Sequence, residues 1–120
     1  MASTIQISFR QVAVLATTVL VADGNQALVG WNLINPISTD AYLKIYNSAT
    51  AAGVTVGTTT PIMTLLIPAG PGTFWQSNED KFQMGFSLGI VIAVTTGIAD
   101  SNTTAPGTGC YVQLFYNANV

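Results

Sequence analysis

The sequence has no histidine, one cysteine and very few charges. Only 7% of its 120 residues are charged, against about 25% in typical soluble domains. The missing histidine removes the commonest general base, and it leaves Cys110 without the partner that activates a cysteine nucleophile. The adjacent acids Glu79 and Asp80 would point apart on an extended chain and could not act together on one substrate. We therefore expect no enzymatic activity and no catalytic residues.

Positive charge is limited to Arg10, Lys44 and Lys81. Nucleic-acid binding depends on clustered cations that displace counterions from phosphates, and these three residues form no cluster in the sequence. The apolar stretches at residues 12–22 and 85–99 are shorter than the roughly 20 residues that a transmembrane helix requires. The N-terminus also lacks the basic start and apolar block of a signal peptide. We therefore expect no nucleic-acid partner, no membrane span and synthesis in the cytoplasm.

A single cysteine excludes an intrachain disulfide. Cys110 stands at the start of an apparent strand, which predicts an inert buried thiol. Residues 100–102, Asp-Ser-Asn, offer oxygen atoms of the kind that calcium prefers. One carboxylate is few for that cation, and these residues are ordinary turn formers, so we favour a turn. The sequence predicts no metal and no cofactor.

What the chain has instead is β-branched sequence between glycines and prolines. The run at residues 90–96 is bounded by Gly89 and Gly97 and predicts a strand buried on both faces. Its small residues Gly89 and Ala93 share one face, where we expect close packing by a neighbouring subunit. The opposite face would carry Leu88, Ile90, Ile92 and Val94.

Period-two alternation and turn residues divide the rest of the chain. On the strand predicted at residues 41–47, Leu43 and Ile45 are expected in the core, and residues 48–60 are expected to form a long loop with at most a short strand at 54–56. The charged run at residues 78–81 is expected to be a solvated turn. The remaining predicted strands are residues 5–10, 12–22 with a break near 17–18, 27–35, 62–67, 73–76 and 110–117.

No amphipathic helix pattern interrupts these strands. About eight to ten short strands between turns predict an all-β, single-domain β-sandwich with jelly-roll or Greek-key wiring. Within it, residues 1–26 are expected to form an N-terminal strand and arm region able to contact another subunit, and residues 27–120 the sandwich core.

So little charge predicts that part of the surface is buried against other chains. We expect a homo-oligomer. The candidate interface comprises one face of the first strand, two tyrosines that flank Lys44, and one tryptophan: Ile5, Ile7, Phe9, Tyr42, Tyr46 and Trp75.

Several phrases of the sequence occur together in one known group of proteins. They are AYLKIYNSAT at residues 41–50, PIMTLLIPAG at 61–70 and GFSLGIVIAVTTGIAD at 85–100, followed by a last strand that ends on Phe115 and Tyr116. In this order, over residues 28–116, the chain resembles small phage structural proteins. The resemblance implies a β-sandwich virion component, such as a capsid decoration (cement) protein or a head or tail fibre module. The implied partner is the major capsid protein or another virion protein, and the implied location is the particle surface. A three-fold position on a capsid would make the expected homo-oligomer a trimer.

Two alternatives remain at the sequence level. Trp31, Trp75, Tyr42 and Tyr46 could form a sugar-binding platform of a phage fibre or adhesin module, although core or interface packing explains the same aromatics with fewer assumptions. A secreted β-sandwich domain is the other alternative, and it would require an export signal.

Overall fold

Two antiparallel sheets make up the part of the chain that the structure, a computed structural model, describes: residues 6–76 and 83–118, with backbone only for residues 71–76. Sheet A has the strand order β1-β9-β3-β6, with β7 also paired to β3, and sheet B has the order β2-β8-β4-β5. The bounds are β1 Gln6–Val14, β2 Val19–Asp23, β3 Gln26–Asn35, β4 Ala41–Asn47, β5 Met63–Ile67, β6 Gly70–Gln76, β7 Met84–Phe86, β8 Gly89–Thr95 and β9 Cys110–Ala118.

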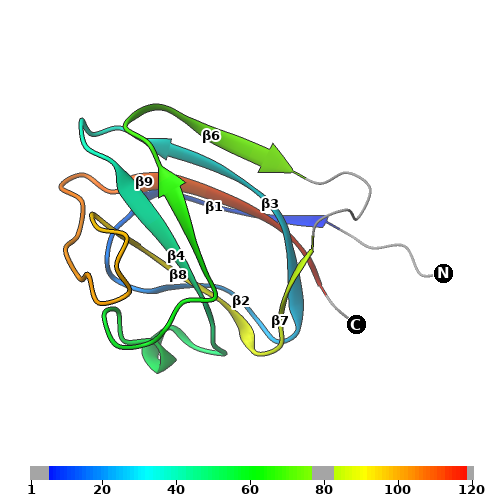
Figure 1. The fold of residues 1–120 in the computed structure, drawn as a ribbon. Helices are drawn as coiled ribbons and strands as arrows, with labels where there is room; N and C mark the ends of the chain where they lie inside the picture. The colour runs from blue at the N-terminus through cyan, green and yellow to red at the C-terminus, as the bar shows by residue number, and fades with distance from the viewer. Residues whose placement is uncertain (1–5, 77–82, 119–120) are drawn as a thin grey trace.

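The strands pair in a nested order. β1 pairs with β9, β2 with β8, β3 with β6 and β4 with β5, as in one long hairpin that has been rolled up. The contacts of β9 with β3 and of β8 with β4 then close the rolled ribbon into two facing sheets (Figure 1). This is the jelly-roll arrangement. The predicted all-β sandwich is confirmed, and of the two predicted wirings the structure adopts the jelly roll.

β8 is the buried centre of sheet B, as its β-branched sequence predicts. All its residues are buried, with Ile90, Ile92 and Val94 in the core between the sheets. Leu43 and Ile45 of β4 lie in the same core, as expected. Leu88 was predicted on the same face as the core residues of β8, and this prediction is wrong, because Leu88 precedes the strand and is largely exposed.

The second face of β8 packs closely, but against its own chain. Val91 and Ala93 contact Tyr46 and Val54 in a smaller apolar cluster. A Cβ atom on Gly89 would lie 2.8 Å from the carbonyl oxygen of Ala22, and it would also meet backbone of residue 48. The expectation that a neighbouring subunit packs on this face is therefore wrong, because the loop at residues 48–60 already covers it.

This loop is confirmed, but the short strand expected at residues 54–56 is absent. The carbonyl of Thr55 accepts hydrogen bonds from the N–H groups of Thr58 and Thr59, and its own N–H donates to the Thr59 hydroxyl. A local turn thus uses the backbone groups that a sheet ladder would need. The loop also contains the 3-10 turn η1, Ala51–Gly53. No helix in the described part of the chain is long and apolar enough to span a bilayer.

The N-terminal strands differ from the prediction in length. β1 runs on to Val14, because its pairing with β9 continues through a register shift between Gln11 and Val14. The predicted break does occur before β2, and Gly24, with φ of 78°, makes the predicted turn from β2 in sheet B to β3 in sheet A. β6 begins at residue 70, three residues before the predicted strand. The charged run at residues 78–81 lies outside the described residues.

Candidate functional site

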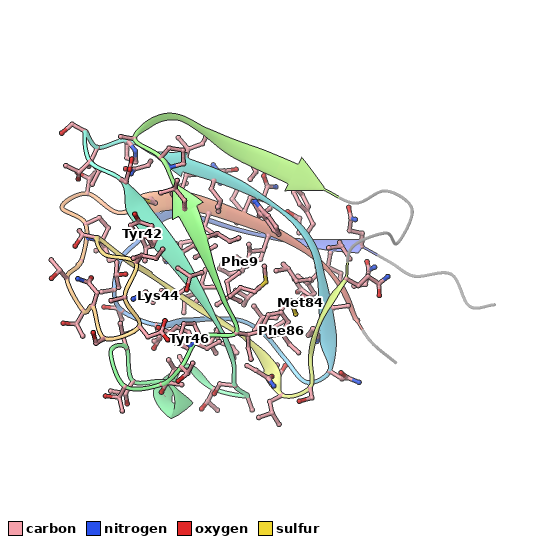
Figure 2. All side chains as sticks on the ribbon, in the orientation of Figure 1. Phe9, Tyr42, Lys44, Tyr46, Met84 and Phe86 are labelled. Atoms are coloured by element: carbon pink, nitrogen blue, oxygen red, sulfur yellow. The ribbon has the colours of Figure 1, made fainter. Side chains whose placement is uncertain are left out.

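The outer face of sheet B is closed by two loops. Tyr42, Lys44 and Tyr46 alternate with the core residues along β4 and so face away from the other sheet (Figure 2). The loop at residues 48–60 and the loop at residues 96–109 extend over this face and meet where Gly57 lies against Thr103. As a result Lys44 and Tyr46 are 0% exposed.

Lys44 ties the second loop to β4. Its ammonium donates hydrogen bonds to the carbonyl oxygens of Ala99 and Asn102. Burial lowers the pKa of Lys44, and the negative charge of Asp100 opposes that shift in part. Because the ammonium is occupied by two backbone carbonyls, this arrangement tethers a loop and presents no free amine for chemistry.

The turn expected at residues 100–102 is confirmed. The side-chain oxygen of Asn102 accepts hydrogen bonds from the backbone N–H groups of Gly97 and Thr104, each at 3.2 Å. The backbone N–H of Asn102 donates to the Ala99 carbonyl. The backbone carbonyl of Asn102 accepts a hydrogen bond from the Lys44 ammonium, which joins this turn to β4.

The structure contradicts the assignment of Tyr46 to the candidate interface. Its ring belongs to the apolar cluster under the loop at residues 48–60, and its hydroxyl is buried without a hydrogen-bond partner in the described structure. Burial, and secondarily the charge of Asp100, raise the pKa of this hydroxyl. A side chain without exposed surface cannot contact another subunit, so the prediction for Tyr46 is wrong.

The outer face of sheet A carries a connected set of polar side chains. The Arg10 guanidinium lies over the Tyr111 ring, 5.4 Å from its centroid, and its Nε donates to the Tyr111 hydroxyl. That hydroxyl donates to the Gln113 side-chain oxygen, and the Gln113 amide donates to the Ser8 hydroxyl at 2.9 Å. These contacts draw the outward side chains of β1 over β9.

The other candidate interface residues do not form one surface. Ile7 is 38% exposed on β1, whereas Phe9, two residues on, packs against the core (Figure 2). Tyr42 is partly exposed on sheet B. Ile5 lies outside the described residues, and only the backbone of Trp75 is described, opposite Trp31 in the pairing of β3 with β6.

The four aromatics of the sugar-platform alternative are also separated. Trp31 is half-buried against the core of sheet A, whereas Tyr42 and Tyr46 belong to the outer face of sheet B. Tyr46 is covered completely. The three described members therefore share no exposed face.

Six of the nine large apolar side chains that are exposed among the described residues lie at two opposite edges of the sandwich. The first group, which we call the β1–β2 rim, lies on β1, β2 and their connection and consists of Ile7, Val12, Leu15 and Leu20. The second group, the β5 patch, lies at the far edge of sheet B. It consists of the exposed residues Ile62 and Leu66 and the partly exposed Tyr42. Tyr42 stands opposite Leu66 in the register of β4 with β5, and Ile62 precedes β5.

The interface predicted from the sequence includes one member of each group, Ile7 of the β1–β2 rim and Tyr42 of the β5 patch, and none of the other members. Val12 belonged to the strand predicted at residues 12–22, and the register shift between Gln11 and Val14 is not visible in simple alternation. Leu66 lies in a strand whose edge position depends on the order of all the others. Only the topology could have identified these residues as exposed.

Nothing described resembles a reactive or metal-binding centre. Burial raises the pKa of the Cys110 thiol to about 11, and no three His, Cys, Asp or Glu side chains come together as a metal site among residues 6–76 and 83–118. Comparisons of the chain with protein-family models, with curated proteins and with solved structures found no match.

Proposed function

We propose that the protein is a non-enzymatic structural component of a virion, of the capsid decoration type, which binds a phage head lattice and stabilises it. The observation that carries this proposal is the pair of apolar groups at opposite edges of one small sandwich, the β1–β2 rim and the β5 patch. A protein that strengthens a lattice must contact at least two neighbours, and patches of this kind mark protein interaction sites.

Two further points support it. The phrases that resemble phage structural proteins coincide with β4, β5 and β8. Jelly rolls are also common in viral capsid domains, although lectins and cupins share the fold, so the fold alone does not determine function.

The mechanism would be mechanical. The protein would assemble as a homo-oligomer on the outer surface of the particle and bury apolar area against the major capsid protein or another virion protein. Each contact across a boundary between capsomers adds free energy that internal pressure must overcome before the shell opens.

Cosedimentation with phage heads tests the proposal. We expect the purified protein to bind the heads of the phage that carries its gene, with saturation, and to raise the temperature at which these heads release their DNA. In the variant Leu66→Asp we expect binding to weaken about tenfold or more, because a carboxylate would lose its hydration in the contact.

Ile98→Asp is the matched control. Ile98 is 66% exposed in the loop after β8 and belongs to neither apolar group, so its change should alter binding by less than about twofold. Absence of binding by the unmodified protein would contradict the proposal. Binding on a glycan array without attachment to heads would replace it with the carbohydrate-binding alternative.

A further inference from the structure

Five described strands, β1, β2, β5, β6 and β7, pair on one side only, and all but β1 carry features that discourage pairing with another strand. An exposed edge presents unpaired backbone N–H and C=O groups, which can template a further strand. β7 has only three residues. β2 has only five residues and a register shift between Leu20 and Ala22. β5 also has five residues and is followed directly by Pro68, and β6 contains Pro71. Shortness, irregular register and proline all protect edges of this kind.

β1 has none of these features over most of its length. Residues 6–11 pair with β9 in unbroken register, and this stretch contains no proline. Among the described strands, β9 alone pairs with β1, so no described strand occupies the opposite edge of β1. Of the described edge strands, β1 offers the longest stretch of regular register.

Its one charged side chain does not guard that edge. A charge on an edge strand commonly prevents association, but the Arg10 guanidinium lies over the Tyr111 ring of β9. Ser8 is likewise engaged by the Gln113 amide of β9. The side chains of Ser8 and Arg10 thus lean toward the sheet interior and do not cover the edge.

We propose that β1 pairs antiparallel with β1 of a second copy, so that sheet A continues across a twofold axis at Ser8. In this register Ile7 faces Phe9 of the second copy, and both belong to the core-facing side of the strand. Arg10 faces Gln6, so the two guanidinium groups are not opposed. An axis at Phe9 would place Ile7 against the polar Gln11, and an axis at Arg10 would oppose like charges.

The β1–β2 rim supports a second copy as the occupant. A twofold interface brings the same residues of both chains together. Ile7 directly precedes Ser8, the residue at the axis, and Val12 lies further along the same strand. Both are exposed in the single chain. The pairing predicts a dimer or an even-numbered assembly, in place of the trimer expected from the sequence. It stands independently of binding to a capsid, which the β5 patch would serve.

Oxidative cross-linking tests the register. Directly opposed residues on antiparallel strands have Cβ atoms roughly 4.5–5.5 Å apart, close enough for a disulfide after a small shift. We expect Ser8→Cys to give a disulfide-linked dimer under mild oxidation. Asn32→Cys is the control, since Asn32 lies on the same outer face but on β3, which β9 separates from β1. Cys110 should not compete, because its thiol is buried with a pKa of about 11.

Sedimentation equilibrium of the full chain tests the edge itself. The unmodified protein should have twice the chain mass, and Ile7→Lys should weaken the dimer about tenfold or more by placing ammonium groups beside the axis. Ile34→Lys adds the same charge at a residue of similar exposure, 40% against 38% for Ile7, on β3 away from the edge. We expect it to change the dimer by less than about twofold.

Three results would overturn the inference: a monomer or trimer in the unmodified protein, equal effects of Ile7→Lys and Ile34→Lys, or cross-linking of Ser8→Cys no faster than that of Asn32→Cys. If Ile7→Lys unfolds the chain, the comparison of the two cysteine variants still decides. Head binding by a monomer, or head binding lost while the dimer persists, separates this inference from the proposed function.

Discussion

At the scale of a single residue, Lys44 is a charge removed from water to hold a loop. Replacing it by alanine removes both hydrogen bonds to the carbonyls of Ala99 and Asn102 and leaves a cavity under the loop, so we expect a loss of about 3 kcal/mol in the free energy of unfolding. Lys44→Met fills the space and removes the desolvated charge, and should cost only about 1 kcal/mol.

Loop dynamics distinguish a tether from simple packing. In both Lys44 variants we expect faster hydrogen exchange at the amides of Gly97 and Thr104, which depend on the loop geometry that Asn102 maintains. Exchange at β8 amides serves as the internal reference. Unchanged exchange at Gly97 and Thr104 in Lys44→Met would show that the ammonium does not hold the loop.

Cys110 gives a pH dependence with a definite sign. Burial raises the pKa of its thiol from 9.0 to about 11, so between these pH values the unfolded chain loses its proton first and the folded chain binds more protons. The stabilisation is therefore complete below pH 9 and is lost as pH rises toward 11. It amounts to about 2–3 kcal/mol.

The variant Cys110→Ala isolates this effect. Urea unfolding at a series of pH values should give a difference in stability between the two proteins that declines over this range. Tyr46 and Lys44, whose pKa values are also shifted, are present in both proteins and cancel in the difference. A difference that stays constant with pH would refute the prediction.

At the scale of the element, Gly89 fixes where β8 begins. Its φ of 150° lies in the region that favours glycine, and a Cβ would collide with the backbone carbonyl of Ala22. We expect Gly89→Ala to lower the free energy of unfolding by about 3 kcal/mol or more. At Gly85 in β7 a Cβ meets nothing within 4 Å, so Gly85→Ala should change stability by less than about 1 kcal/mol. Equal melting temperatures for the two variants would contradict this account.

Elements with strong local signals could be read from the sequence. β3 ends where Pro36 follows, β4 has the predicted bounds, and the β-branched run of β8 is buried on both faces. The end of β1 and the start of β6 were missed because pairing partners distant in the chain extend these strands past their local pattern.

The candidate site depended on still longer-range contacts. Lys44 is buried by residues 55 and 58 positions away, and Arg10 rests on a tyrosine 101 positions away. Alternation assigned Tyr46 correctly to the outer face of β4, but it could not reveal that a loop covers this face. Burial of a strand face was predictable only where the strand itself was apolar on both sides.

At the scale of the whole molecule, the nested topology explains why the open edge belongs to β1. Rolling up the hairpin brings the first and last strands together, so β9 becomes an inner strand of sheet A while β1 remains outside it. The same rolling places β5, at the tip of the hairpin, on the opposite edge of sheet B. The two apolar groups thus face away from each other, which suits a protein that binds its own copy at one edge and another partner at the other.

Because the molecule carries so few charges, we predict that the stability of this dimer depends little on salt concentration. The paired β1 strands carry Arg10 as their sole described charge, directed toward Tyr111 and facing Gln6 in the proposed register. Salt shortens the Debye length from about 10 Å at 0.1 M to about 3 Å at 1 M, which weakens associations driven by opposite charges. Backbone hydrogen bonds and apolar contacts are not screened in this way. The dimer dissociation constant, measured by sedimentation equilibrium, should therefore change less than about threefold over this range. Weakening by about tenfold or more would show that charges outside β1 hold the copies together, and would move the interface to another face.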